Sequence, residues 1–360
     1  MGRRFSPLDR KLKLRADHWS EGAAKVAARQ GLQTQSFTRA AEGYSEAVGG
    51  AISDESVRLI TEGWGAACEA KRNTEAAWVN APGQRGERLD ASRLTPIDPL
   101  TQQANISSDG AKLFVRGEGW KEVKMTAMSA VGVQAAAERT GTSERPSRRA
   151  SDLLVRLTRH SYQAGLWEVE DFAHQQYAEG VRRGLEQSAP LSSVNDGAPW
   201  IERTTRENFP QATQLIDWSH VEERLGLVAA AALGAASAAA HTWTEARLDR
   251  LWEGKPQAVL SALRHLKIKA PRTAKALVQD NIVYFQNQQG RMHYDQYRAA
   301  GLPIGSGTVE SAATTLVHLR LKRPGRGWCR DNAQSMLAGL SELHSDRFAL
   351  TWNAISSSPR

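Results

Sequence analysis

Small and apolar residues recur at helical spacing along the first part of the chain. The pattern predicts helices over 21–30 and 37–48, the second ending at Gly49-Gly50, and a third helix that Ser53 caps. Two helices joined by a glycine-containing turn are a helix-turn-helix candidate, although the same pattern is typical of a plain helical hairpin. We therefore expect a helical N-terminal region over residues 1–79.

Proline, glycine and charged residues without periodicity then predict a linker over 80–104. Three short strand-like runs follow, over 105–108, 112–116 and 120–131. Asp109-Gly110 and Gly117-Glu118-Gly119 separate these runs and are typical of turns, so the pattern predicts a β-meander. The polar and basic stretch 140–149 is predicted to be a surface loop.

The next part of the chain alternates between helical and strand-like patterns. The predicted elements are a helix over 169–187, a strand over 191–194, a helix over 200–208 and a strand over 212–216. This alternation implies that part of the sheet is parallel. Residues 221–289 have a helical pattern almost throughout, and one or two helices are expected over 308–350, interrupted at 323–325. The expected fold class is mixed α/β and rich in helix.

Charge adds a class of partner to this picture. The chain of 360 residues has 47 Lys and Arg against 39 Asp and Glu, a formal net charge of +8, which favours nucleic acid first and anionic membranes second.

Cys68 and Cys329 belong to no CxxC pair, which excludes a disulfide framework and a cysteine-based zinc module. The most apolar run, 225–240, is shorter than the roughly 20 residues of a membrane span. No apolar segment follows the basic N-terminus, so we expect a cytoplasmic protein.

Three acidic residues stand next to predicted elements in a way that suits metal chemistry. Asp109 and Asp196 follow strand-like runs, and Glu310 lies just inside a helix that begins after a glycine turn. Carboxylates at neighbouring strand ends can converge, and a few carboxylates with open positions suit Mg²⁺ and phosphodiester chemistry. With 39 acidic residues in the chain, this placement alone is a weak signal, and a single Asp-Gly is more often a turn.

Longer strings around these acids are more specific. In chain order they are Ser108-Asp109-Gly110, Gly119-Trp120-Lys121-Glu122-Val123-Lys124, Asn195-Asp196-Gly197-Ala198-Pro199-Trp200-Ile201, Asp217-Trp218-Ser219-His220 and Gly305-Ser306-Gly307-Thr308-Val309-Glu310-Ser311. From about Phe5 to Trp352 the chain resembles the DDE transposases of bacterial insertion sequences, in the Mutator-like group of ISKra type. The resemblance implies a ribonuclease H-like catalytic core over 105–220 and 300–350, with an α-helical insertion over 221–299.

The resemblance also implies roles for individual residues. Asp109, Asp196 and Glu310 would be the catalytic, metal-binding triad for Mg²⁺, with Mn²⁺ as a substitute. Asp217 and His220 match the Cys/Asp-x-x-His motif and would be accessory residues of the active site. Taken by themselves, this Asp and His three positions apart could also bind DNA, orient a phosphate or cap a helix, and His220 could equally be a packing histidine.

A basic run follows Glu310 within roughly five helical turns. It consists of Arg320, Lys322, Arg323, Arg326 and Arg330. Such a run is usually a solvated face, but behind a phosphodiester site we expect it to bind the DNA backbone, because phosphate contacts dominate DNA affinity. Trp120 and Trp200 are expected to pack in the core or on the sheet rather than to stack on bases.

The expected function is Mg²⁺-dependent cleavage at transposon ends and strand transfer into target DNA. The implied partner is double-stranded DNA, both the terminal inverted repeats of the element and the target DNA. We also expect a homodimer or higher oligomer on the DNA. The expected location is the bacterial cytoplasm, at the nucleoid, with no membrane partner. Two alternatives stay open: a decayed or domesticated derivative that only binds DNA, and a ribonuclease H-like nuclease without strand transfer. In the family a paired-cysteine segment often precedes the position of Phe5–Asp9, so we expect either a truncated start or loss of that module.

Overall fold

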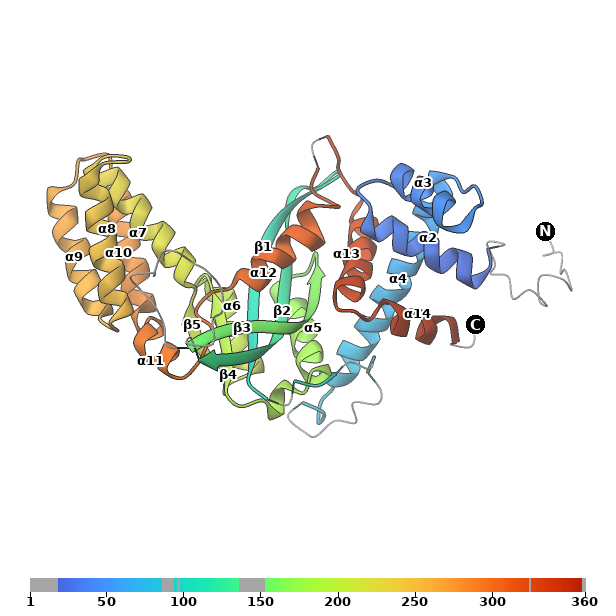
Figure 1. The fold of residues 1–360 in the computed structure, drawn as a ribbon, viewed down its shortest axis with the longest axis horizontal. Coiled ribbons are helices and arrows are strands. Elements are labelled where there is room, and N and C mark those ends of the chain that lie inside the picture. The colour runs from blue at the N-terminus through green and yellow to red at the C-terminus, as the bar shows by residue number, and fades with distance from the viewer. Residues whose placement is uncertain are drawn as a thin grey trace, which may run out of the picture.

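The computed structural model describes residues 19–85, 94–95, 98–100, 102–135, 153–323 and 325–357. In these residues helices surround one five-stranded sheet (Figure 1). The strands are β1 (Ala104–Val115), β2 (Gly119–Ala135), β3 (Leu153–Gly165), β4 (Leu191–Asn195) and β5 (Thr213–Ile216). The helices before β5 are α2 (Glu21–Gln33), α3 (Phe37–Val48), α4 (Asp54–Val79), α5 (Val169–Arg182), η3 (Leu185–Gln187) and α6 (Pro199–Asn208). Those after β5 are α7 (Trp218–Leu233), α8 (Ala238–Trp252), α9 (Pro256–Lys269), α10 (Lys275–Gln288), η4 (Gln289–Arg291), α11 (Tyr294–Ala299), α12 (Gly307–Ala312), the π-helical η5 (Ala313–His318), α13 (Arg330–His344) and α14 (Phe348–Ser357).

The sheet is mixed, with strand order β3-β2-β1-β4-β5. The pairs β3-β2 and β2-β1 are antiparallel, whereas β1-β4 and β4-β5 are parallel. The mixed α/β class and the parallel part of the sheet are therefore confirmed. The predicted loop over 140–149 and the residues Phe5–Asp9 lie outside the described part of the chain.

The strands predicted for the meander are wrong, because Asp109-Gly110 is not a turn: residues 105–108 and 112–115 belong to the single strand β1, and β3 is the third strand of the antiparallel meander. In the hairpin of β1 and β2, Asp109 pairs with Met125 and Gly110 with Lys124 without a break. A Cβ atom at position 110 would lie 2.6 Å from Oε1 of Glu122, the end of a flexible side chain that could move aside. The real turn is at Gly117 and Gly119, both with φ of +78°.

The sequence pattern gave no indication of β3. This strand lies at the edge of the sheet; its first half is partly buried, with Arg156, Thr158 and Arg159 exposed, and its last five residues are all buried. Its ladder with β2 shifts register between Met128 and Ala130, and Arg159 in β3 has a positive φ of 52°. Because partly buried and then fully buried residues follow one another along β3, the two-residue period of a half-buried strand is weak.

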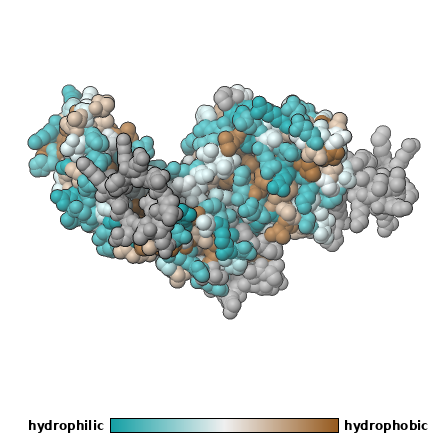
Figure 2. Space-filling view, in the orientation of Figure 1, coloured by the Kyte–Doolittle hydropathy of each residue, from teal (hydrophilic) through white to brown (hydrophobic). Residues whose placement is uncertain are grey.

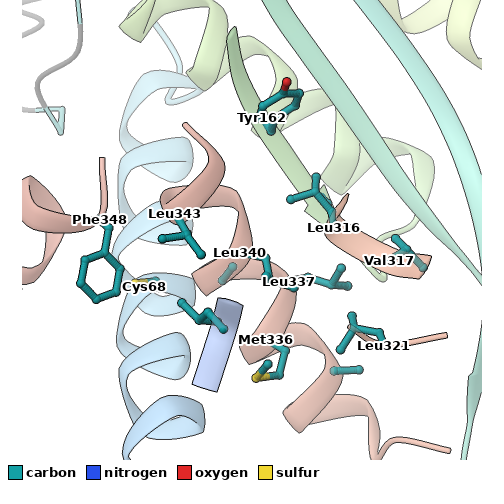
Figure 3. Close-up of a cluster of buried hydrophobic side chains, with 14 of the residues drawn as sticks. Cys68, Tyr162, Leu316, Val317, Leu321, Met336, Leu337, Leu340, Leu343 and Phe348 are labelled. Carbon is teal, nitrogen blue, oxygen red and sulfur yellow. The ribbon is translucent and has the colours of Figure 1, made fainter. Parts of the chain in front are cut away.

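The N-terminal helices share a hydrophobic core with the sheet. Buried residues of α2, α3 and α4 belong to the same cluster as residues of β1, β2, α12, η5 and α13. Figure 3 shows α13 between α4, which contributes Cys68, and η5, which contributes Leu316 and Val317. Helices α4 and α13 approach closely at Gly65, where a Cβ atom would lie 2.2 Å from the carbonyl oxygen of Ser335. The predicted helices are confirmed, and α4 is a long core helix rather than the short second helix of an isolated helix pair.

Helices α7 to α11 form a second body with its own core. Its apolar cluster includes Leu225, Leu251, Leu263 and Phe285, and it continues into the sheet at Ile216. In Figure 1 these helices project to one side of the sheet, opposite to α2, α3 and α14. The helical block expected over 221–289 is confirmed, with its first helix beginning already at Trp218.

The surface in view is of mixed polarity. Figure 2 shows hydrophilic residues over much of the outer end of the α7–α10 bundle and scattered hydrophobic patches over the rest of that face. Within the ranges described above, none of the helices combines the length and apolarity needed to cross a membrane.

Candidate active site

The first two acids belong to two neighbouring parallel strands and their ends: Asp109 is in β1, and Asp196 directly follows β4. Strand β1 pairs with β4 so that Ile106 lies opposite Ser193, and the Asn195 side chain accepts a 2.6 Å hydrogen bond from the backbone N–H of Ser108. This ladder ends at Ile106 and Ser193; the same register counted three residues further reaches Asp109 and Asp196, and the charge of Asp196 acts on Asp109. Since neighbouring strands are about 4.8 Å apart, the sheet brings together two residues that are distant in sequence.

The carboxyl group of Asp109 is affected electrostatically by the other predicted site residues. Burial raises its pKa, and the hydrogen bond that Oδ1 accepts from the Gly110 N–H, 2.7 Å long, lowers it. The charges of Asp196 and Glu310 raise the pKa further, whereas His220 lowers it. No Lys or Arg among the described residues forms an ion pair that would offset the repulsion between these acids. This part of the chain thus gathers negative charge around Asp109.

The Asp196 loop is held by the helical body. The carbonyl oxygen of Asp196 accepts a 2.8 Å hydrogen bond from the hydroxyl of Tyr284, and the Gly197 carbonyl accepts a 3.2 Å bond from Nε2 of Gln288, both on α10. The guanidinium of Arg224 lies 3.8 Å from the centre of the Tyr284 ring. Sequence reasoning missed Tyr284 and Gln288, since no local signal links them to a loop about 90 residues earlier.

Asp217 is a structural anchor of the site. Its side chain is fully buried and caps α7, with Oδ1 accepting from the N–H and the hydroxyl of Ser219 at 2.5 and 2.6 Å. Oδ2 accepts from the N–H of Ser306 at 2.5 Å and from its hydroxyl. The Asp217 N–H donates to the Asn195 carbonyl at 2.8 Å. With both oxygens occupied, Asp217 joins the end of β4, the start of α7 and the loop before α12.

Glu310 is exposed and loosely held. The hydroxyls of Ser219 and Ser306 lie 3.5 and 3.4 Å from its Oε1, but both already donate to Asp217 at shorter distance. A hydroxyl has one proton to donate, so these contacts restrain Glu310 weakly. Its carboxylate therefore remains available for a ligand.

His220 lies on the first turn of α7, half-buried, with Nδ1 4.0 Å from Oε2 of Glu223. A charged His220 would lower the pKa of Asp109. Within the motif Asp217-x-x-His220, the aspartate builds the loop junction, whereas the contact of the histidine is with Glu223 on the same helix.

The donor atoms suit a hard cation. In the described ranges, no three or more His, Cys, Asp or Glu side chains form a group that could hold a metal ion as it stands. Mg²⁺, however, is usually bound by one or two protein carboxylates, with water and substrate phosphate completing its shell. Asp109 and Asp196 meet that requirement with oxygen ligands, and Glu310 is the third acid nearby.

Arg320 does not belong to an exposed DNA-binding face, contrary to expectation. Its side chain is buried, its Nε donates to the Gly31 carbonyl at 3.0 Å, and its guanidinium lies 4.3 Å from the Phe37 ring centre. Burial lowers its pKa to about 10. Arg330 is exposed but paired with Glu118 at 2.6 Å. Lys322, Arg323 and Arg326 line one pocket together.

The two tryptophans behave differently. Trp200 packs edge-on against the buried Phe172, with ring centres 5.2 Å apart, as expected. Trp120 is 60% exposed, so it does not pack in the core, but its ring packs on the sheet against its cross-strand neighbour Phe114. It lies at the start of β2.

Comparison with known families and with curated proteins finds no match to this chain. Its function is therefore inferred from its own residues.

Proposed function

We propose that the chain is a DDE transposase that cuts DNA at the ends of a mobile element and joins the freed 3′-OH to target DNA. One observation supports this proposal: Asp109 on β1 and Asp196, the residue after the parallel neighbour β4, lie close enough that the charges of Asp196 and Glu310 raise the pKa of Asp109, and no Lys or Arg in the described ranges pairs with these acids. The five-stranded mixed sheet is compatible with a ribonuclease H-like core. The helices α7 to α11 lie between the second and third acids, where the transposase resemblance expects an insertion.

The chemistry requires two in-line displacements at phosphorus. In the first, water attacks the scissile phosphate, the P–O3′ bond breaks and a 3′-OH is freed. In the second, that 3′-OH attacks a target phosphate and the new ester bond replaces a target P–O bond. Bound Mg²⁺ would activate the attacking oxygen and stabilise the leaving oxygen.

The side chains of the site have separate tasks in this proposal. Asp109 and Asp196 supply the oxygen ligands, and the loosely held Glu310 completes the acidic site. His220 would hydrogen-bond a phosphate of the bound DNA. The substrates are the element's terminal inverted repeats and target DNA, a homodimer or higher oligomer assembles on them, and the net charge of +8 favours this polyanionic partner.

The test is an assay with supercoiled plasmid and with pre-cleaved oligonucleotides that carry the element's ends, in Mg²⁺ or Mn²⁺. Asp109→Asn, Asp196→Asn and Glu310→Gln are each expected to reduce cleavage and joining about 1,000-fold, equivalent to about 4 kcal/mol of transition-state stabilisation. The matched controls are Asp280→Asn and Glu207→Gln, two exposed acids on α10 and α6.

The products discriminate among the alternatives. Cleavage without joining would indicate a nuclease, and DNA binding without either reaction would indicate a decayed derivative. Triad variants as active as the two controls would refute the assignment of these acids.

A further inference from the structure

An open pocket of about 760 Å³ lies at the far end of the β1–β2 hairpin. Two aromatic rings from the hairpin and a segment that follows η5 form its walls. Its lining residues are Phe114, Trp120, His318, Lys322, Arg323, Gly325, Arg326 and Gly327. None of these residues belongs to the acidic site, so the pocket needs its own explanation.

The aromatic wall presents an indole to solvent. Trp120 is 60% exposed and Phe114 is 40% exposed. Their ring centres are 5.6 Å apart with planes at 75°, so Phe114 supports Trp120 edge-on. Large exposed aromatic rings that form a patch are typical of binding sites. The indole is fixed in orientation and accessible to a planar ligand.

The other wall is basic. Lys322 Nζ lies 5.8 Å from the centre of the Trp120 ring. Arg326 donates to the Gln35 carbonyl at 2.8 Å and Arg323 to the Leu319 carbonyl at 3.2 Å, which anchors each guanidinium through one nitrogen and leaves further N–H groups for a ligand. Among the described residues that line the pocket, none is acidic. An aromatic face beside three cations suits a ligand with a flat ring and a phosphate.

The pocket is close enough to the acids to share one DNA strand with them. Phe114 lies five residues beyond Asp109 on β1, about 17 Å at 3.3 Å per residue. His318 follows Glu310 by eight residues of α12 and η5, about 12 Å at helical rise. Phosphates along one strand of a duplex are about 3.4 Å apart along its axis, so about five nucleotides separate the pocket from the acidic site.

We propose that this pocket binds an unpaired nucleotide of the DNA end, with the base stacked on Trp120 and its phosphates held by Lys322, Arg323 and Arg326. The base must be unpaired, because a base inside a duplex has both faces covered by its neighbours. A basic groove with exposed aromatic rings is the general arrangement for single-stranded nucleic acid. This inference rests on the proposed function and specifies the form in which the DNA end is held.

The test compares two DNA probes without divalent metal, so that no reaction occurs. One is a blunt duplex and the other is the same duplex with a five-nucleotide single-stranded overhang. We expect the unmodified chain to bind the overhang duplex about 5- to 100-fold more tightly, the range for one stacked base. Trp120→Ala should abolish this preference and leave the affinity for blunt duplex unchanged, and Trp120→Phe should retain most of it.

The control for Trp120→Ala is Ile268→Ala. It removes a highly exposed apolar side chain far from the pocket lining, on α9. Replacing Lys322, Arg323 and Arg326 by Gln should flatten the log–log salt dependence of overhang binding by about 0.7 for each phosphate that the protein no longer neutralises. Equal binding of both probes by the unmodified chain, or a preference that survives Trp120→Ala, would overturn the inference.

Asp109→Asn separates this inference from the proposed function. It should keep the overhang preference while losing cleavage. If it cleaves normally, the proposed function fails. If cleavage is lost but Trp120→Ala keeps the preference for the overhang, only the pocket assignment fails.

Discussion

At the scale of single residues, the acidic site works against the stability of the fold. Asp109 is half-buried and repelled by Asp196 and Glu310, so its pKa is raised. A carboxyl whose pKa is raised in the folded state binds its proton more tightly there than in the unfolded chain. Protonation therefore stabilises the fold as pH falls through the raised pKa, whereas at neutral pH the charged form destabilises the fold. Such an arrangement is typical of sites built to receive a ligand charge.

We therefore predict that Asp109→Asn raises the melting temperature of the metal-free protein at pH 7 by roughly 2 °C. The amide keeps the oxygen that accepts the Gly110 N–H and removes the charge. Adding Mg²⁺ should raise the melting temperature of the unmodified chain more than that of the variant, because a ligand stabilises only the state that binds it. Thermal unfolding with and without Mg²⁺ measures both effects, with Glu207→Gln as control. A lower melting temperature and an undiminished Mg²⁺ effect would contradict this account of Asp109.

At the scale of elements, the site depends on how loops are tied together. Asp217 joins α7 to the loop that precedes α12 through both oxygens of its carboxylate. Tyr284 and Gln288 of α10 hold the loop that carries Asp196. The α7–α11 body therefore supports two of the three acids, although it supplies none of them.

Asp217→Asn is predicted to retain Mg²⁺ binding but to reduce strand transfer about 10- to 100-fold. An amide replaces one acceptor oxygen by a donor, so the Ser219 or the Ser306 N–H loses its partner, at a cost of about 1–3 kcal/mol. Calorimetric Mg²⁺ titration, melting temperature and strand-transfer rate are the measurements, beside Glu310→Gln. If Asp217→Asn abolished Mg²⁺ binding while Glu310→Gln left it intact, Asp217 rather than Glu310 would complete the metal site.

At the scale of the whole molecule, a buried ionic network joins the helices that cover the sheet. Arg182 of α5 pairs with Glu75 of α4 at 2.6 Å and with Glu179. Arg347, just after α13, pairs with Glu179 at 2.7 Å and with Glu342 at 2.9 Å. Burial alone would raise the pKa of Glu179, but the charges of Arg347 and Arg182 lower it well below its ordinary value.

Removing one partner from this network should be strongly destabilising. Arg347→Met is predicted to lower the free energy of unfolding by about 3–5 kcal/mol, because Glu179 and Glu342 stay buried with less compensation. The stability that Glu179 contributes is fully present above its unfolded pKa of about 4.5 and is lost as pH falls below it. Arg347→Met should therefore shift acid unfolding to higher pH.

Urea titration at pH 7 and circular dichroism from pH 7 to pH 2 measure the two effects. Arg206→Met is the matched control, since it breaks an exposed pair with Glu202 that is worth at most about 1 kcal/mol. An effect no larger than that of the control would mean that the buried network does not hold the helices together.

The sequence by itself determined what depends on neighbouring residues. Ser53 caps a helix that begins at Asp54, the strand before Asp196 ends at Asn195, and a helix begins at Gly307 just before Glu310. These features follow from hydrophobic period, capping and glycine turns, which act over a few residues. The three acids were found by the local strings around them.

Only the tertiary structure decided what depends on distant partners. The Asp-Gly pair lies inside β1 because Met125 and Lys124 of β2 continue the ladder past it. Arg320 is buried because Gly31 and Phe37 reach it from the other end of the chain. Trp120 remains largely exposed because the distant segment nearest to it, that of Lys322, lies across an open pocket from it. Burial and pairing of this kind arise from contacts between residues far apart in sequence, which no local pattern specifies.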